Sequence, residues 1–390
     1  MDIAESLAER GHVVKVLTGF PNYPSGVLQQ GYRQRWRRRD QLGPVQVLRV
    51  PMFIDHSQSA LKRVVNYTSF ALSALTARRF AKGSDVVYVY ATPMTAGVPA
   101  WIWRLLFGVP YVLHVQDLWP DSVLGSTMVG EGRGASLIGR ALTPWLRSMY
   151  RQAAAVIGIA PTMVSTLVDR GSPAASTMLI YNWAGDASGS EAPRVRVRRG
   201  AAVRVVYAGN VGAMQDLGTA IRAVHAAKDT GVHLEIVGDG VAHEELQTLV
   251  SDLGVENVSF HGPVPRERMP EVYARSDVAL VPLKDLPVFR GTIPSKLQAV
   301  LAAGLPVLTT VQGDVRAFVE AHGLGFTADP EDVEALESSL RAVAASSAEE
   351  RCRMGANAAR AYRDNFTRES GIDRIESVLV EAARGKSRRR

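Results

Sequence analysis

The stretch "VRVVYAGNVGAMQDLGTAIRAVHAAKDTGVHLEIVGDG", residues 203–240, contains two short apolar strands separated by one helical segment. Both strands are rich in β-branched residues, and glycine with polar residues ends each of them. Such strands alternate with helices when they run parallel in a sheet that helices cover on both faces. The stretch therefore predicts an α/β fold of the doubly wound type, with a helix starting near Asp216.

The same alternation continues in both directions and divides the chain. Residues 184–200 combine small residues, prolines and charges, which indicates a linker. Before it, we expect strands at HVVKVLTG (12–19), VQVLRVPM (45–52), DVVYVYAT (85–92), PYVLHVQD (110–117), AAVIGIA (154–160) and TMLIYNW (177–183), and helices at 60–82, 95–107, 135–152 and 162–170. After 240, strands are expected at NVSFHG (257–262), DVALVPL (277–283) and PVLTTV (306–311). We predict doubly wound domains at 1–183 and 201–365, and a C-terminal helix with a basic tail at 366–390.

Composition narrows the class of protein. The chain has 390 residues, no apolar run of the ~18–20 residues that a membrane span needs, and no signal peptide. The single cysteine, Cys352, excludes an internal disulfide framework, so we expect a cytoplasmic location. Residues 1–183 carry 19 Lys and Arg against 10 Asp and Glu, whereas the remainder carries 26 against 28. The excess is concentrated in RQRWRRR (Arg33–Arg39), either a solvated loop or a contact with an anionic surface, and Trp36 favours a membrane interface over nucleic acid.

The chain starts with an amphipathic helix, DIAESLAERGH, closed by Gly11. A doubly wound domain normally starts with a strand and a glycine-rich turn. We therefore expect Met1 to be an internal methionine, with the first strand encoded roughly 20 residues upstream.

FRGTIPSKLQAVLAAGLPVL (289–308) places charges where a buried helix begins. A helix that starts near Pro294 or Ser295 leaves its first amides unpaired, and its dipole adds positive charge there. Proline suits the first turn, Ser295 can cap, and Lys296 and Arg290 add full charges. We interpret this helix start as a diphosphate site; the structural alternative is a capped core helix with solvated cations.

Other strand ends add weaker signals. In AGNVGAMQDL (208–217), Gly209 and Gly212 let a ligand approach the backbone closely. FHGPVP (260–265) has amides that suit a flat base, whereas VGDG (237–240) indicates a plain turn. In YVLHVQDLWPDSV (111–123), His114 and Asp117 end a buried strand, where a core histidine is the structural alternative to a functional one. GFPNYPSG (19–26) suits an acceptor pocket.

Several signatures are missing. The sequence has no Asp-x-Asp clamp for a metal–diphosphate pair, no Walker lysine motif, no zinc helix and no Gly-x-Ser-x-Gly elbow. Its glycine turns do not match Gly-x-Gly-x-x-Gly, which weighs against a dinucleotide oxidoreductase.

Over residues 1 to about 380 the chain resembles the GT-B glycosyltransferases of family 4, in the branch that adds sugars, often amino-deoxy sugars, to O-antigen, capsule or exopolysaccharide. The resemblance rests on DIAESLAERGHVVKVLTGFPNYPSG, HVQDLWPDS, YAGNVGAMQDL, VGDG, NVSFHGPVPRERMPEVYARSDVALVPL and PSKLQAVLAAGLPVL. It implies two Rossmann-like domains that face a cleft, and metal-independent transfer with retention of configuration.

The resemblance also implies roles for single positions. The diphosphate would contact Arg290, Gly291, Ser295, Lys296 and the turn of Gly209, Asn210, Gly212 and Gln215, and the base would contact Gly262, Pro263 and Val264. A histidine near the position of His114 contacts the transferred sugar in related enzymes. We predict His114, Asp117, Lys296 and Arg290 as the catalytic residues. Many members carry a Glu-x7-Glu pair, but the matching positions here are Gly291 and Ala299.

We therefore expect a hexosyl- or N-acetylhexosaminyl-transferase that uses a nucleotide-sugar, with UDP the expected nucleotide, and a lipid-linked or glycan acceptor at the inner membrane face, with no nucleic-acid partner. The alternatives are a sugar-nucleotide epimerase on the same plan and an inactive remnant that still binds nucleotide-sugar.

Overall fold

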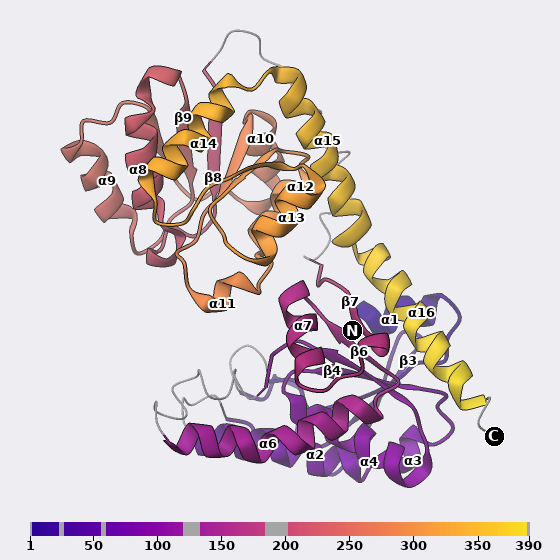
Figure 1. Ribbon diagram of the computed structural model, residues 1–390. Coiled ribbons are helices and arrows are strands. Elements are labelled where there is room, and N and C mark those ends of the chain that lie inside the picture. The colour runs from indigo at the N-terminus through magenta and orange to yellow at the C-terminus, as the bar shows by residue number, and fades with distance from the viewer. Residues whose placement is uncertain (1, 23–26, 56–59, 120–132, 184–201, 388–390) are drawn as a thin grey trace. The chain divides into compact units, whose positions relative to one another are not determined.

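The computed structural model describes residues 2–22, 27–55, 60–119, 133–183 and 202–387 (Figure 1). The chain divides into two compact units, Met1–Ile180 with Ile372–Arg390, and Tyr181–Gly371. The predicted linker lies outside the described residues, and so do the three arginines at the C-terminus.

The second unit is built on a sheet with strand order β10-β9-β8-β11-β12-β13, in which all neighbours run parallel. Its strands are β8 (Arg204–Ala208), β9 (His233–Val237), β10 (Val258–His261), β11 (Val278–Val281), β12 (Val307–Thr309) and β13 (Gly325–Thr327). The chain moves outward from β8 to β10 and then returns to β11. The strand order therefore reverses between β8 and β11, where doubly wound sheets bind their ligands.

Helices connect and cover these strands. They are α8 (Leu217–Ala226), α9 (His243–Asp252), α10 (Met269–Ala274), α11 (Pro287–Arg290), α12 (Ser295–Ala302), α13 (Asp314–His322), α14 (Val333–Ala345) and α15 (Ala348–Asn365), with 3-10 turns at Ala213–Gln215, Lys228–Thr230 and Arg266–Arg268. α8 and α14 lie side by side, and their Ile221, Leu336 and Leu340 join Val205 and Leu234 of the sheet in one apolar core. α12 packs against α15.

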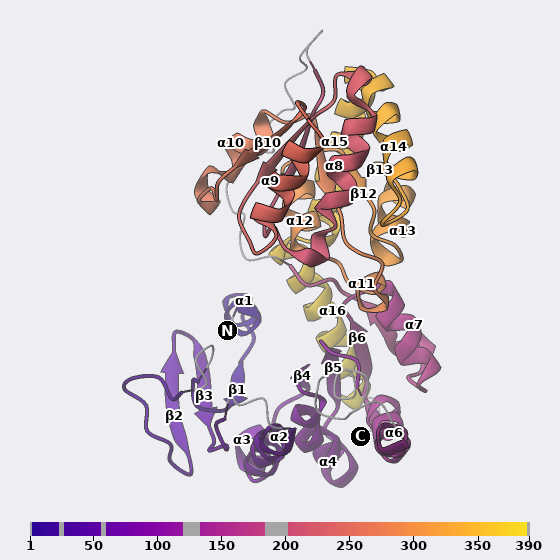
Figure 2. The same ribbon diagram turned by 90° about the vertical axis from the view of Figure 1, so that its left-hand side faces the viewer.

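The first unit divides its strands between two sheets (Figure 2). β4 (Val87–Ala91), β5 (Tyr111–Val115), β6 (Ala155–Gly158) and β7 (Thr177–Leu179) form a parallel sheet, whereas β1 (Lys15–Thr18) and β3 (Val45–Arg49) pair in parallel with β2 (Arg38–Leu42) antiparallel at the edge. α2 connects the two, because its Ala74 belongs to the β3 core and its Tyr67 packs on the β4–β5 core. The α/β class with parallel sheets is confirmed; the upstream strand concerns residues outside this chain and stays a prediction.

The helices of the first unit are α1 (Asp2–Glu9), α2 (Ala60–Leu75), α3 (Arg78–Ala81), α4 (Val98–Phe107), α6 (Arg133–Gln152), α7 (Pro161–Asp169) and the last part of α16 (Arg368–Ser387), with 3-10 turns at Met94–Gly97 and Ala174–Ser176. The helix expected at 60–82 is broken, and the Thr76 carbonyl at the break accepts a bond of 2.6 Å from Arg37 Nη2. Arg10 Nη1 forms ion pairs of 2.6 Å with Asp373 and with Glu376 of α16.

The basic stretch is not simply a loop, because Arg38 and Arg39 begin β2. Its polar sequence hides this strand from a hydrophobic pattern; a two-residue turn at Gly43 and Pro44 instead folds it back onto β3. Arg38 then forms an ion pair of 2.8 Å with Asp40.

We expect Gly238→Ala to destabilise the second unit by about 2–3 kcal/mol. A Cβ at this position would lie 2.0 Å from the Gly209 carbonyl oxygen, and φ is +137°. The matched control is Gly218→Ala, within α8, where the nearest side-chain atoms would lie 3.9 Å away. It should be neutral or stabilise by up to about 1 kcal/mol. Calorimetric unfolding of both variants tests this, and equal transition temperatures would contradict it.

Candidate functional site: the glycine turn and Lys296

The chain leaves β8 through a backbone that presses against the neighbouring turn. Gly209 has a φ of +141°. A Cβ on Gly238 would lie 2.0 Å from the Gly209 carbonyl oxygen, and a Cβ on Gly240 would lie 2.3 Å from the Val211 carbonyl oxygen. The glycines of VGDG are therefore needed for backbone packing, which is the role expected of a plain turn. This close approach fixes the position of the glycine turn at the switch point.

Lys296 lies against this turn. Its Nζ donates a hydrogen bond of 2.5 Å to the Tyr207 hydroxyl and stands 3.8 Å from the centre of the Tyr207 ring. A Cβ on Gly209 would come within 3.0 Å of Cε and 3.3 Å of Nζ of the lysine. The Tyr207 hydroxyl in turn donates to the Asn210 carbonyl oxygen. The structure thus brings together the lysine of α12 and the glycine turn, which the sequence had indicated separately.

α12 begins where the sequence predicts, but Ser295 is not its cap. Pro294 is the N-cap residue, in an extended conformation, and Ser295 is the first helical residue. Ser295 is exposed and does not cap: the helix start has no side-chain cap, because proline offers no acceptor. The Leu297 amide donates a bond of 3.0 Å to the Pro294 carbonyl oxygen. The amides of Ser295 and Lys296 have no hydrogen-bond partner among the described residues, so these two can bind an external anion.

The charge of Lys296 is set by burial. Burial lowers its pKa from 10.5 to about 7, because removal from water disfavours the ammonium form. Among the described residues no carboxylate forms an ion pair with it. An anion placed at the turn would supply the missing opposite charge.

Asn210 and Gln215 hold the turn itself. Gln215 Oε1 accepts 3.0 Å from the Gly212 amide and 3.3 Å from Asn210 Nδ2. A Cβ on Gly212 would lie within 2.8 Å of both side chains. The geometry gives Gln215 a part in shaping the turn, and its contact with a ligand stays a prediction.

Arg290 is paired rather than free. It ends α11, and its Nη2 and Nε bond the two carboxylate oxygens of Asp285 at 2.6 and 2.9 Å. This pairing holds the pKa of Asp285 below its ordinary value. Gly291 follows directly, and the Arg290 carbonyl oxygen packs where a Gly313 Cβ would stand, at 2.1 Å. Arg290 therefore forms an exposed ion pair, and its contact with a diphosphate stays a prediction.

The loop predicted to bind the base, Gly262, Pro263 and Val264, follows β10 at the edge of the sheet. Gly262 and Pro263 are exposed, and Val264 is half-buried. Since β8, β9 and β10 are parallel, this loop and the glycine turn leave the same edge of the sheet. Its contact with a base stays a prediction.

His114 and Asp117 lie in and just after β5 of the first unit. His114 is completely buried, its Nδ1 shares a hydrogen bond of 2.5 Å with the Tyr88 hydroxyl, and its Nε2 has no partner among the described residues. Burial lowers its pKa to about 4, so the ring is neutral at pH 7. Asp117 is exposed at the strand end, and partial desolvation raises its pKa. The catalytic roles of His114 and Asp117 stay predictions. The hydrogen bond between His114 Nδ1 and Tyr88 is the kind of contact that the alternative, a core histidine, would make.

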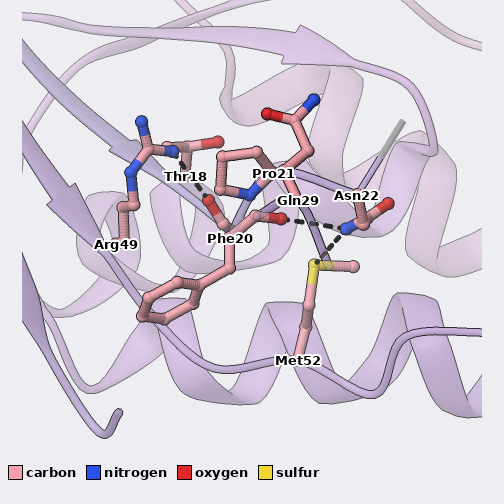
Figure 3. Close-up of a pocket in the computed structure, with 8 residues that line it drawn as sticks. Thr18, Phe20, Pro21, Asn22, Gln29, Arg49 and Met52 are labelled. Atoms are coloured by element: carbon pink, nitrogen blue, oxygen red, sulfur yellow. Dashed lines mark hydrogen bonds between the residues drawn. The ribbon is translucent and has the colours of Figure 1, made fainter. Parts of the chain in front are cut away.

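The first unit has a cavity of about 360 Å³ at the end of β1 (Figure 3). It is lined by Thr18, Gly19, Phe20, Pro21, Asn22, Gln29, Arg49 and Met52. Arg49 is buried, donates 2.8 Å to Asp40 Oδ2 and 3.1 Å to the Gly19 carbonyl, and stacks on the Tyr32 ring. The lining thus combines the Arg49 guanidinium and the amide side chains of Asn22 and Gln29 with the apolar Phe20 and Met52. Tyr23–Gly26 of the predicted acceptor loop lie outside the described residues.

Known proteins match this architecture. A Glycosyl transferase 4-like domain matches residues 1–183, and the domain of Glycosyl transferases group 1 matches residues 202–346. The chain belongs to the GT-B glycosyltransferases. WcaI of Escherichia coli, whose name assigns it to colanic acid biosynthesis as a glycosyl transferase, is 28% identical to this glycosyltransferase over 364 residues, 87% of this chain and 86% of WcaI. The glycosyltransferase WbjE of Pseudomonas aeruginosa is 23% identical over 278 residues, 69% and 68% of the two chains. The structure of Anabaena HepE in complex with UDP and glucose superposes with a TM-score of 0.54 at 18% identity, covering 86% of each chain.

Sequence reasoning missed two residues of these sites. Tyr207 has the position of a buried strand residue, and only its aromatic hydroxyl just before a glycine turn signals a polar role. Arg49 ends an apolar strand, where a buried cation is a signal because it needs a partner.

We expect Lys296→Met to raise the thermal stability of the glycosyltransferase at pH 6.5, because the variant removes a half-buried, poorly solvated cation that has no carboxylate partner among the described residues. Relief of about 1 kcal/mol corresponds to about 2–4 °C in a domain of this size. The same variant should lose stabilisation by UDP. Differential scanning fluorimetry with and without UDP measures both, with Lys228→Met, at an exposed position, as control. A lower melting temperature that retains the UDP response would contradict the assignment.

Proposed function

We propose that this glycosyltransferase moves a sugar from a UDP-sugar to a lipid-linked or glycan acceptor in cell-surface polysaccharide biosynthesis, with retention of anomeric configuration. The contact of Lys296 with the glycine turn carries the proposal. The names of WcaI and of HepE bound to UDP and glucose support the reaction class and the nucleotide.

The diphosphate would bind at the switch point. Its oxygens would accept from the free amides at the start of α12 and from Lys296, while Gly209 lets it approach the turn. Negative charge grows on the diphosphate oxygen as the bond to the sugar C1 breaks. Fixed amides and an ammonium at that position stabilise this charge, so no protein nucleophile is required.

The donor would be recognised without the carboxylate pair that many members of the family use, because Gly291 and Ala299 occupy those positions. Metal-independent transfer is part of the proposal, and the sequence without Asp-x-Asp supports it. The acceptor would bind the first unit, for which the cavity beside Asn22, Gln29 and Arg49 offers polar groups next to the apolar Phe20 and Met52.

We further propose that the first unit rests on the inner face of the cell membrane. Along the described stretches no helix has the length and apolarity of a membrane span. Instead α2 and α4 lie side by side (Figure 1). The two helices expose apolar residues: Val64, Val65, Leu72, Leu105, Leu106 and Phe107. Arg78 stacks on Phe107, and Arg79 and Lys82 are exposed nearby in the chain. Apolar side chains among cations fit a surface of anionic lipids.

We expect Lys296→Ala to reduce sugar transfer about 10²–10³-fold, as the removal of one preorganised group that stabilises the departing charge does. A thermal-shift panel of nucleoside diphosphate sugars, each with EDTA, would first identify the donor. Initial rates with that donor then compare Lys296→Ala with Lys228→Ala. Unchanged turnover in Lys296→Ala would refute its role, and donor binding without transfer by the wild type would favour the inactive remnant.

For the membrane surface, we expect Leu106→Glu to weaken binding to phosphatidylglycerol vesicles about tenfold, because it removes an apolar contact and adds repulsion. Cosedimentation measures this. Val241→Glu, at an exposed position of the second unit, is the matched control and should bind like the wild type. Equal binding of both variants would contradict this surface, and binding to phosphatidylcholine alone would exclude the anionic preference.

A further inference from the structure

The second unit holds the half-buried Lys296 through a neutral partner. Lys296 Nζ contacts the hydroxyl and the ring of Tyr207, and that hydroxyl is fixed by its bond to the Asn210 carbonyl. A neutral hydroxyl orients an ammonium group but does not replace the solvation that the group loses on burial.

Charged groups on the surrounding elements do not compensate. Lys296 is the sole charged residue in the sequence of α12, and β11 and β12 contain none. Before α12, Arg290 is paired with Asp285. On α15, which packs against α12, the buried Arg351 donates to the Ser346 carbonyl and hydroxyl. From β8, Tyr207 faces Lys296, and burial raises its pKa, so its hydroxyl stays neutral.

We propose that Tyr207 is a positioning residue for Lys296, and that binding of a nucleoside diphosphate at the glycine turn is coupled to uptake of one proton by Lys296. This inference rests on the proposed function, because it takes the diphosphate to bind there. The proton comes from solvent and occupies the Nζ lone pair, and no covalent bond changes.

The coupling follows from the two environments of the lysine. Without a ligand, burial lowers the pKa of Lys296 to about 7. A bound diphosphate places negative charge beside Nζ and raises the pKa again. At pH 8 about a tenth of the free protein carries the charged lysine, so the apparent Kd rises about tenfold per pH unit above pH 7. Binding at pH 8 then takes up about 0.9 proton.

Isothermal titration of the full chain with UDP tests this between pH 7 and 8.5, where the terminal phosphate of UDP, with a second pKa of about 6, is mostly ionised. Titrations at pH 8 in buffers of different ionisation enthalpy give the number of protons taken up. We expect about 0.9 for the wild type. We expect close to zero for Lys296→Arg, which stays charged and should show a Kd that hardly changes with pH. Should Lys296→Arg not fold, Lys296→Met should bind weakly with no uptake.

Tyr207→Phe tests the positioning role, because it keeps the ring and removes the hydroxyl. The variant loses the hydroxyl that accepts a hydrogen bond from the Lys296 ammonium. The pKa of Lys296, and with it the pH above which the Kd rises, should therefore fall by about one unit. Tyr273→Phe, at another buried tyrosine of the second unit, should leave the profile unchanged.

The outcomes separate the two claims. A wild-type Kd that is constant from pH 7 to 8.5, or equal proton uptake by wild type and Lys296→Arg, overturns the coupling and leaves the proposed function standing. A Tyr207→Phe profile identical to the wild type overturns the positioning role. Failure of the wild type to bind UDP at any pH overturns the proposed function together with this inference.

Discussion

The hydrogen bond from the Lys296 ammonium to the Tyr207 hydroxyl holds the lysine at the proposed ligand site of the second unit. It joins α12 to the end of β8, across the point where the strand order reverses. A lysine in this position is poorly solvated and has no carboxylate among the described residues. Such an arrangement opposes folding, so its presence at the ligand-binding edge of the sheet is better explained by an anionic ligand than by stability.

Backbone contacts fix the geometry around that lysine. The Gly209 carbonyl packs where Gly238 has no side chain, and the Arg290 carbonyl packs where Gly313 has none. Both contacts would be blocked by any Cβ. They act together with the Gln215 side chain, which bonds the Gly212 amide, and with the Arg290–Asp285 ion pair before α12. Among the described residues, the amides of Ser295 and Lys296 at the start of α12 have no hydrogen-bond partner.

Much of this follows from the sequence, because apolar β-branched runs predict parallel strands and glycines predict where they turn. Apolar runs do not show that β8 pairs with β11. The sequence therefore indicates a common ligand for Lys296 and Gly209 only through their residue types, and not through their positions in the sheet. Tyr207 was hidden because a strand tyrosine usually belongs to the core. The pairing of Arg290 with Asp285, five residues earlier, could not be predicted, because it depends on the fold of the segment between them. β2 is polar and has no alternation of apolar residues, so its sequence pattern does not predict a strand. The turn at its end instead brings it into antiparallel pairing with β3.

The two units differ in how they use charge. The first carries the basic excess of the chain together with exposed apolar residues on α2 and α4, and such a surface acts through many weak contacts. The second, Tyr181–Gly371, carries 20 Lys and Arg against 25 Asp and Glu, and it relies on one half-buried lysine with oriented amides. Net charge therefore cannot explain the affinity for an anion that we propose for the second unit. Fixed dipoles and one desolvated cation can, because a low-dielectric site strengthens each of them and excludes the screening ions that weaken a charged surface.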